Sequence, residues 1–287
     1  MLMDEKHATA RAFRGKMKKQ SVSFTIEALR KHEMSEVADF MHDSSLRVMT
    51  YNIHHGRGMD GRVSLARIAE QIYLSEASIV ALQEVDRYIP RSGFRDQFEW
   101  LAKELGMYAA FAPSMRIGPC QYGNALFSRY PIVGKRIVYM PGRLERRSVL
   151  LTDLSVGGGR MTVANTHLGV FRTDWVKQMP IFRTVLEKLD KPSIVLGDFN
   201  MVTGNKYMKK LRSMLKKVVL QNSMPTLQYG GEIDHILVNA PTTEAFAWVQ
   251  PSDASDHHAV VAQIRWHKAQ AGRAADAVRS MAISGYN

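Results

Sequence analysis

Short apolar runs alternate with amphipathic stretches between residues 46 and 266 of this chain. Runs rich in β-branched and aliphatic residues predict strands, whereas apolar residues spaced three and four apart predict helices. The runs on either side of Gly157, Gly158 and Gly159 predict a hairpin, because glycine forms tight turns at low steric cost. We expect strands at about 46–54, 78–84, 107–113, 123–129, 149–156, 160–167, 193–197, 233–238 and 258–266, and helices at about 63–75, 95–105, 174–189 and 205–217.

The predicted strands occur both in hairpins and in crossovers flanked by helices. This combination predicts an α/β (α+β) fold in which two mixed sheets pack together with helices outside. Three parts follow from the pattern: an N-terminal extension at 1–45, a catalytic candidate at 46–266 and a tail at 267–287, which predicts a short helix or a frayed end.

The N-terminal extension combines positive charge with helical spacing of apolar residues between 26 and 41. It predicts contact with an anionic surface or with a partner helix. The alternative is a solvated helix that packs on the core by its apolar stripe. Its basic cluster has no acid between its members: Arg11, Arg14, Lys16, Lys18 and Lys19.

The composition limits the class of binding partner and the cellular compartment that we expect. The 287 residues carry a formal net charge of +12, which favours an anionic partner such as nucleic acid, phospholipid headgroups or a phosphorylated small molecule. A single cysteine, Cys120, excludes an internal disulfide and a cysteine-rich zinc site, and it fits a reducing compartment. No apolar run reaches 18 residues and no secretory signal opens the chain, so we expect a cytoplasmic protein.

Polar residues that handle metal and phosphate follow several of the apolar runs. Polar groups at the same end of neighbouring strands form the active sites of α/β sheets. A carboxylate at the end of an apolar strand, as at Glu84, is costly unless a partner such as a divalent cation neutralises it. The other candidates are Asn52, His167, Asp198, Asn200 and, just before the last predicted strand, Asp256 and His257.

Asp198 and Asn200 lie two residues apart, so they would project from the same face if the strand continued through them. The carboxylate would then take a proton from water while the amide fixes the water or a phosphate oxygen. Asp256 is placed to orient His257 or to ligate metal, and Asp234 is an alternative imidazole partner. Oxygen-rich donors predict Mg²⁺ or Mn²⁺ rather than zinc.

Taken in order, these segments resemble the successive motifs of the endonuclease/exonuclease/phosphatase superfamily, in particular its small bacterial-type members, over about residues 46–266. The resemblance implies a four-layer α/β/β/α sandwich and metal-dependent hydrolysis of phosphate esters. The motifs are Thr50-Tyr51-Asn52-Ile53, Leu82-Gln83-Glu84-Val85-Asp86, Tyr122-Gly123-Asn124-Ala125, Thr166-His167-Leu168, Gly197-Asp198-Phe199-Asn200, Ile233-Asp234-His235-Ile236 and Ser255-Asp256-His257.

The resemblance also implies a role for each site residue. Glu84 would be the principal metal ligand with Asn52 beside it, and Asp198 would align or deprotonate the attacking water. His167, Asn200 and Tyr122 would contact the phosphate. Asp256 and His257 would complete the site, with Asp234 orienting His257.

One departure concerns the residues after Asn52. Many members carry an acid two residues after this asparagine, whereas this chain has Ile53, His54, His55 and Gly56. Either a second metal position is lost, or His54 replaces the acid as a ligand better suited to Mn²⁺ than to Mg²⁺. A third interpretation is that His54 and His55 only shape the loop.

We therefore predict a metal-dependent phosphodiesterase acting on DNA or RNA, with a phospholipid or small phosphate ester as the alternative and a non-catalytic phosphate-binding module as a further one. Arginine suits phosphate, which predicts substrate contacts for Arg143, Arg146 and Arg147. The lysine-rich predicted helix at 205–217 is either a nucleic-acid contact or a solvated face. A lipid enzyme would expose apolar residues near His167, where Phe171 and Trp175 either serve this purpose or pack beneath their own helix.

Overall fold

The computed structural model describes residues 45–239 and 242–266, except for the side chain of Thr243. The predicted N-terminal extension up to residue 44 and the tail from residue 267 lie outside the described residues. Within the described part, no helix is long and apolar enough to cross a membrane.

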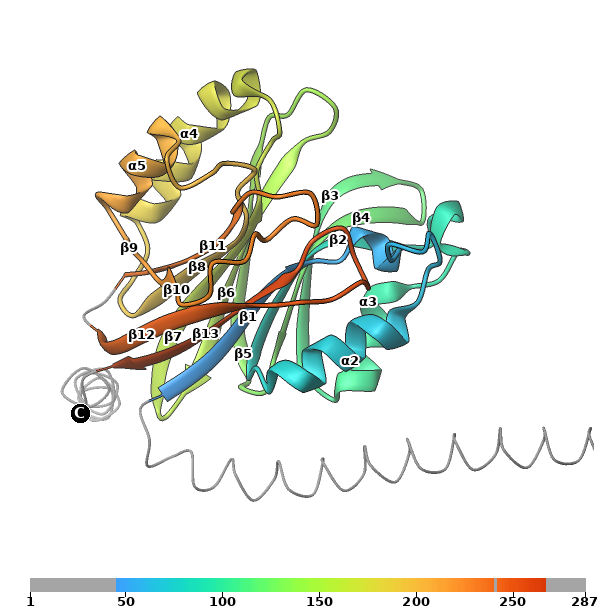
Figure 1. Ribbon diagram of the computed structural model, residues 1–287, viewed down its shortest axis with the longest axis horizontal. Helices are drawn as coiled ribbons and strands as arrows, with labels where there is room; N and C mark the ends of the chain where they lie inside the picture. Colours follow the sequence, from blue (N-terminus) through green and yellow to red (C-terminus); the bar gives the residue numbers. More distant parts are fainter. Residues whose placement is uncertain (1–44, 240–241, 267–287) are drawn as a thin grey trace, which may run out of the picture. The chain divides into compact units, whose positions relative to one another are not determined.

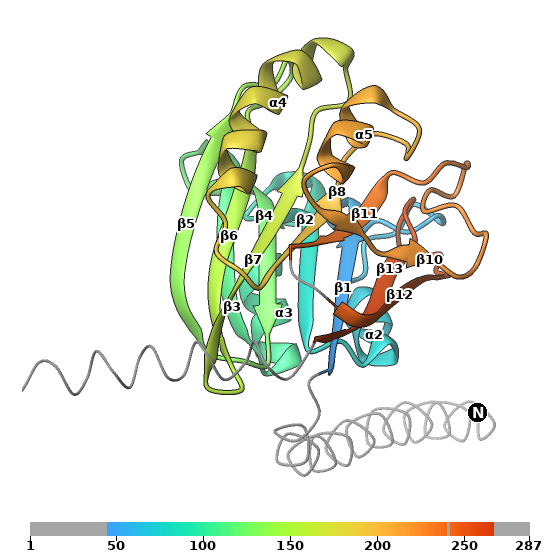
Figure 2. The same cartoon turned by 90° about the vertical axis from the view of Figure 1, so that its left-hand side faces the viewer.

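Two mixed β-sheets face each other (Figures 1 and 2). In spatial order, the first sheet contains β10 (Val219–Leu220), β12 (Thr242–Gln250), β13 (Ala259–Trp266), β1 (Ser45–Asn52), β2 (Ile79–Arg87), β4 (Cys120–Ser128) and β3 (Tyr108–Ile117). The second contains β5 (Ile132–Met140), β6 (Arg147–Val156), β7 (Gly159–His167), β8 (Ser193–Asp198), β11 (Asp234–Val238) and β9 (Lys216–Lys217).

Helices cover the outer face of each sheet, as Figure 1 shows. α2 (Leu65–Ser75) and α3 (Gln97–Leu105) pack on the first sheet, and their buried residues join the core that contains Met49, Val80 and Phe127. α4 (Arg172–Glu187) and α5 (Lys206–Arg212) pack on the second sheet around Phe182 and Phe199. The apolar stripe of each helix explains this placement, and the predicted sandwich of two packed sheets with outer helices is confirmed.

Polar side chains join the two sheets in the interior. Gln83 of β2 donates from Nε2 to Oδ1 of Asn165 of β7 at 2.9 Å, and both side chains are fully buried. The Nδ2 group of Asn165 donates in turn to the carbonyl oxygens of Leu82 and Ala125 at 3.0 and 2.8 Å. Because buried amides are stable only when they are paired, these bonds fix how one sheet sits on the other.

Strand pairing then brings the candidate residues together. β7 and β8 are parallel, with His167 opposite Asp198, and β11 is antiparallel to β8, with Asp234 opposite Asp198. In the other sheet β1 and β2 are parallel, with Asn52 opposite Gln83. Residues from five strands therefore meet at one end of the sandwich.

The structure corrects several predicted elements. The predicted helix at 205–217 is wrong beyond Arg212, because the chain turns to bury Leu215 and then pairs Lys216 and Lys217 with β11. Strand β5 was not predicted because its apolar residues lie in two runs on either side of Gly134, Lys135 and Arg136 and do not alternate with polar ones. Most of its side chains are at least partly exposed at a sheet edge. Strands β9, β10 and β12 also have no counterpart in the sequence prediction.

Gly197 provides a test of how the fold positions Asp198. A Cβ atom at this residue would lie 1.9 Å from the carbonyl oxygen of Thr166 on the paired strand, and φ is +146°. We expect Gly197→Ala to lower the free energy of unfolding by about 3 kcal/mol, measured by urea denaturation. Gly204→Ala is the control, because no atom lies within 4 Å of its Cβ position. Equal stability of the two variants would contradict this account of the β7–β8 contact.

Candidate active site

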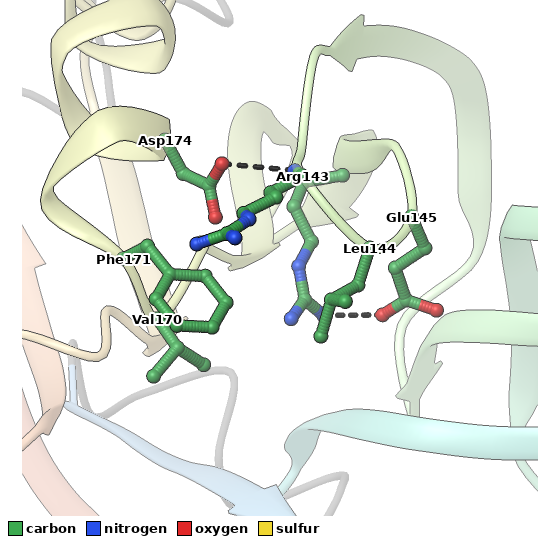
Figure 3. Close-up of a pocket in the computed structure, with 7 residues that line it drawn as sticks. Arg143, Leu144, Glu145, Val170, Phe171 and Asp174 are labelled. Atoms are coloured by element: carbon green, nitrogen blue, oxygen red, sulfur yellow. Dashed lines mark hydrogen bonds and ion pairs between the residues drawn. The ribbon is translucent and has the colours of Figure 1, made fainter.

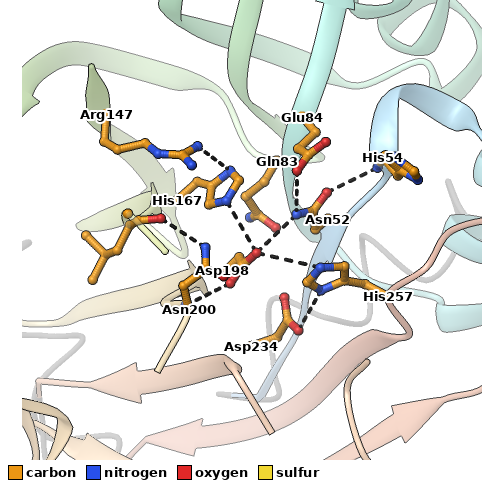
Figure 4. Close-up of polar contacts among 12 residues, drawn as sticks. Asn52, His54, Gln83, Glu84, Arg147, His167, Asp198, Asn200, Asp234 and His257 are labelled. Carbon is orange, nitrogen blue, oxygen red and sulfur yellow. Dashed lines mark hydrogen bonds and ion pairs between the residues drawn. The ribbon is translucent and has the colours of Figure 1, made fainter. Parts of the chain in front are cut away.

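One amide group links carboxylates from the two sheets. The Nδ2 atom of Asn52, at the end of β1, donates to Oε1 of Glu84 and to Oδ2 of Asp198, each at 3.1 Å (Figure 4). Glu84 belongs to the seven-stranded sheet and Asp198 to the six-stranded one. Asn52 and Asp198 are both buried. The two carboxylates are therefore held at a fixed separation by a neutral donor.

Glu84 occupies an irregular point inside β2, so the prediction that the strand ends there is wrong. The strand continues to Arg87, but its register with β4 shifts between Leu82 and Val85. Glu84 has a φ of +62°, which costs a residue other than glycine about 1–3 kcal/mol. Bulges of this kind re-aim a side chain next to functional sites. Here the bulge accompanies the contact of Glu84 with Asn52.

Asp198 lies between two histidines and a second carboxylate. Burial, and then the charge of Asp234, raise the pKa of Asp198 above that of an exposed carboxyl. His257 lies with Nδ1 3.0 Å from Oδ2 of Asp234 and with Nε2 3.7 Å from Oδ2 of Asp198. Burial lowers the pKa of His257, but the neighbouring carboxylates outweigh this effect and raise the pKa above its ordinary value. The arrangement favours an imidazolium held between Asp234 and Asp198.

His167 is held as a neutral imidazole with a defined tautomer. The Nη1 atom of Arg147 lies 3.1 Å from its Nδ1, and a guanidinium group only donates, so Nδ1 accepts. The proton therefore resides on Nε2, which lies 3.4 Å from Oδ2 of Asp198. Burial, the positive charge of Arg147 and that of His257 lower the pKa of His167. His167 thus presents an N–H donor beside the carboxylate of Asp198.

The three arginines predicted to bind substrate lie in different surroundings. Arg147 forms an ion pair with Glu145 at 2.7 Å and contacts His167. The guanidinium group of Arg143 lies over the ring of Phe171, lining the same hollow as Arg147 (Figure 3). Arg146 donates to the carbonyl oxygen of Ser114. Of the three, Arg147 alone has a contact with the other candidate site residues in the described structure.

Asn200 and Tyr122 border the cluster. β8 ends at Asp198, and Asn200 has a φ of +51°, so the expected strand alternation does not relate their side chains. Instead, the backbone N–H of Asn200 donates to Oδ1 of Asp198 at 2.8 Å, and its Nδ2 donates to the carbonyl oxygen of Leu168 at 3.0 Å. Burial raises the pKa of Tyr122, whose phenol therefore stays protonated, and Arg91 stacks on its ring.

The residues predicted to bind metal separate into neighbouring pairs. Asn52 contacts Glu84 through its nitrogen, while its Oδ1 accepts from the backbone N–H of His54 at 3.1 Å. Asp256 lies with Oδ1 3.5 Å from Nδ1 of His54. In this orientation Asn52 directs no oxygen at a cation beside Glu84, and its role as a ligand stays a prediction.

Glu84 forms a group of three possible metal ligands with His54 and His55. One donor atom from each of His54, His55 and Glu84 lies within 4.8 Å of the other two. The buried Nδ1 of His55 has no hydrogen-bond partner, an arrangement that costs about 1–3 kcal/mol. Burial and the charge of Arg91 lower the pKa of His55 to about 4, so this imidazole is neutral. Two imidazole groups and a carboxylate are a donor set that fits a divalent cation.

Several supporting residues were not identified from the sequence. The carboxylate of Asp86 accepts two bonds from Arg91 at 2.9 and 2.8 Å, and the backbone N–H of Asp86 donates to Gln97. Glu145, whose pKa is raised by burial, pairs with Arg147. Nothing in the local pattern distinguishes these residues from ordinary surface charges, although their partners Arg91 and Arg147 are near in the chain.

Comparisons with known proteins agree with the fold. The model of the Endonuclease/Exonuclease/phosphatase family matches residues 49–257. An endonuclease/exonuclease/phosphatase from Beutenbergia cavernae has a TM-score of 0.66 and 26% identity, covering 78% of this chain and 72% of that one. The uncharacterised protein YbhP of Escherichia coli is 28% identical over 170 residues, which is 54% of this chain and 67% of YbhP.

A fungal relative is much longer than the matched segment. Protein cwh43 of Schizosaccharomyces pombe is 29% identical over 152 residues, which is 51% of this chain but only 15% of cwh43. The family match spans most of this chain and includes the polar cluster from Asn52 to His257. The chain therefore belongs to the endonuclease/exonuclease/phosphatase family.

Proposed function

We propose that this chain is a divalent-metal-dependent phosphodiesterase in which water attacks phosphorus directly. The observation that carries the proposal is the amide of Asn52, which holds Glu84 and Asp198 together at the meeting point of the two sheets. Glu84 lies near His54 and His55. Asp198 lies near His167 and His257. This division suits a cation on one side and proton transfer on the other.

Asp198 acts as the base in this proposal. Its raised pKa makes it a better proton acceptor than an exposed carboxylate near neutral pH. The Asn200 N–H and the Asn52 amide fix both oxygens of the carboxylate, so that it orients the water before it takes the proton. Asp234 holds the ring of His257 through Nδ1, which leaves Nε2 directed toward Asp198.

His167 and His257 stabilise the negative charge that develops on the phosphoryl oxygens. His167 donates from Nε2, because Arg147 occupies its Nδ1. His257 donates as an imidazolium, the form that Asp234 favours. Positioned donors of this kind contribute about 10²–10³-fold to rate. A divalent cation bound at Glu84 would neutralise the phosphate and stabilise the leaving oxygen.

Nucleic acid is the first candidate substrate, on the strength of the net charge of +12. The lysine-rich segment adds less than the sequence suggested. Lys209 and Lys210 lie on α5, whereas Lys217 in β9 pairs with Glu232.

Phospholipid is a second candidate, supported by exposed apolar residues next to Arg147. Leu144 is 81% exposed, Val170 53% and Phe171 38%, and all three line the hollow that Arg143 and Arg147 also line (Figure 3). Apolar and cationic groups side by side match an amphiphile that carries a phosphodiester. Trp175 does not contribute, because it packs against the core beneath α4 and its Nε1 donates to the carbonyl oxygen of Gly169.

The first prediction here concerns metal dependence. Excess chelator, or Glu84→Gln, should reduce kcat/KM on a small soluble phosphodiester at least about 10²-fold, with an unchanged circular dichroism spectrum. Added Mn²⁺ should restore the chelated wild type but not Glu84→Gln. Glu244→Gln is the control, because this carboxylate is exposed on β12. Full activity in excess chelator would contradict the proposal.

A second prediction separates the two substrates. Rates should be measured on anionic and zwitterionic phospholipid vesicles, on single-stranded and duplex oligonucleotides, and on a small soluble phosphodiester. If the lipid is the substrate, Leu144→Ser with Val170→Ser should lower the ratio of vesicle rate to soluble-substrate rate at least about tenfold. Leu74→Ser, on the 66% exposed Leu74 of α2, is the matched control. Cleavage of oligonucleotides alone, with a strong salt dependence, would instead select nucleic acid.

A further inference from the structure

The turn after β1 has a conformation that its sequence does not favour. His54, His55 and Gly56 form the single turn η1 (His54–Gly56), and all three have positive φ, at 44°, 47° and 79°. Only the glycine adopts this region readily. Two consecutive histidines in the left-handed region indicate that the turn is fixed by something other than local preference, and strain of this kind concentrates at functional sites.

Interactions with two other elements hold the turn in place. The Nε2 atom of Gln97, on α3, donates to the carbonyl oxygen of His55 at 2.7 Å, and the Oε1 atom of Gln97 accepts from the backbone N–H of Asp86 at 3.0 Å. Asp86 follows Glu84 by two residues on β2. The fully buried Gln97 therefore fixes the histidine turn relative to the bulge that carries Glu84.

The side chains converge without bonding to one another. Donor atoms of His54, His55 and Glu84 lie within 4.8 Å of each other, and the two imidazole rings meet edge to face at 4.6 Å between centroids. His55 is 6% exposed, and its Nδ1 has no partner. Figure 4 shows His54 beside Asn52, on the opposite side of the cluster from Arg147.

We propose that His54, His55 and Glu84 bind a first-row transition-metal ion, such as Mn²⁺ or Co²⁺, in preference to Mg²⁺. Two imidazoles and one carboxylate are a donor set for transition ions, whereas Mg²⁺ requires oxygen ligands and retains its waters. Binding of an ion would place a partner beside His55, whose buried Nδ1 has none among the described residues. This inference rests on the proposed function for the role of the ion, since it identifies the ion that the same hydrolytic site uses.

Metal binding by the full chain, stripped with chelator and measured without substrate, tests the inference. Co²⁺ binding is followed by its visible absorption, and Mn²⁺ and Mg²⁺ by competition against Co²⁺. The wild type should bind Co²⁺ and Mn²⁺ at least about 10²-fold more tightly than Mg²⁺. His55→Ala should weaken Co²⁺ at least about tenfold and change Mg²⁺ by less than about twofold, so that the preference falls.

A second variant tests the site without replacing a buried residue, whose loss could unfold the protein. The side chain of His54 is 30% exposed, so His54→Asp is expected to fold. Because it exchanges an imidazole for a carboxylate, it should weaken Co²⁺ and strengthen Mg²⁺. His258→Gln is the matched control, because Nδ1 of His258 accepts from the backbone N–H of Ser252 and this residue is not one of the three possible ligands.

The outcomes separate this inference from the proposed function. Equal Co²⁺ affinity in wild type, His54→Asp and His55→Ala would overturn the site, even if the protein hydrolyses phosphodiesters with Mg²⁺. A wild type that prefers Mg²⁺ would overturn it as well. Selective Co²⁺ binding that depends on both histidines would support it, even if every phosphodiester tested were left intact.

Discussion

The amide nitrogen of Asn52 joins the two halves of the site. It has two N–H groups, and each meets a carboxylate from a different sheet, Glu84 or Asp198. Two carboxylates brought together in a buried place would repel one another without a donor between them. The position of each β-sheet relative to the other therefore depends on keeping this neutral bridge, together with the buried bond between Gln83 and Asn165.

The charges around Asp198 follow from this constraint. Asp198 and Asp234 are paired across β8 and β11, and both are buried. Such a pair is tolerated because donors surround it: His257 contacts both, and Asn52 and the backbone of Asn200 bond Asp198. On the other side, burial and then the charge of Arg147 lower the pKa of His167 and keep this histidine neutral. The two histidines thus differ in protonation because buried His167 lies against the guanidinium group of Arg147, whereas His257 lies between two carboxylates.

Much of the fold was predictable from the sequence, because buried strands and amphipathic helices carry periodic patterns. The strands that end at Asn52, His167 and Asp198 were predicted on this basis, and the sandwich of two sheets is confirmed. β5 was not predicted, since its apolar residues occur in two runs without alternation and most of its side chains are at least partly exposed at the sheet edge. The helix predicted through Lys217 failed because tertiary pairing with β11 overrides a helical spacing of lysines.

Parts of the site depend on geometry that no sequence pattern contains. The bulge at Glu84 and the left-handed turn at His54 and His55 appear only in the backbone. The contact between Arg147 and His167 joins strands β6 and β7 and was not distinguishable from the neighbouring Arg143 and Arg146 in the sequence. The catalytic roles themselves stay predictions, whereas the proximity of Asn52, Glu84, Asp198 and His257 is a property of the structure.

A double-mutant cycle between Glu84 and Asp198 tests the central claim most directly. The rate kcat/KM on a small soluble phosphodiester is measured with Mn²⁺ for wild type, Glu84→Gln, Asp198→Asn and the double variant. If the two carboxylates act as one unit, each single variant should lose at least about 10²-fold in kcat/KM. The kcat/KM of the double variant should then lie less than about tenfold below that of the less active single variant. Losses that multiply, or a single variant that keeps more than about a tenth of wild-type kcat/KM, would contradict the account.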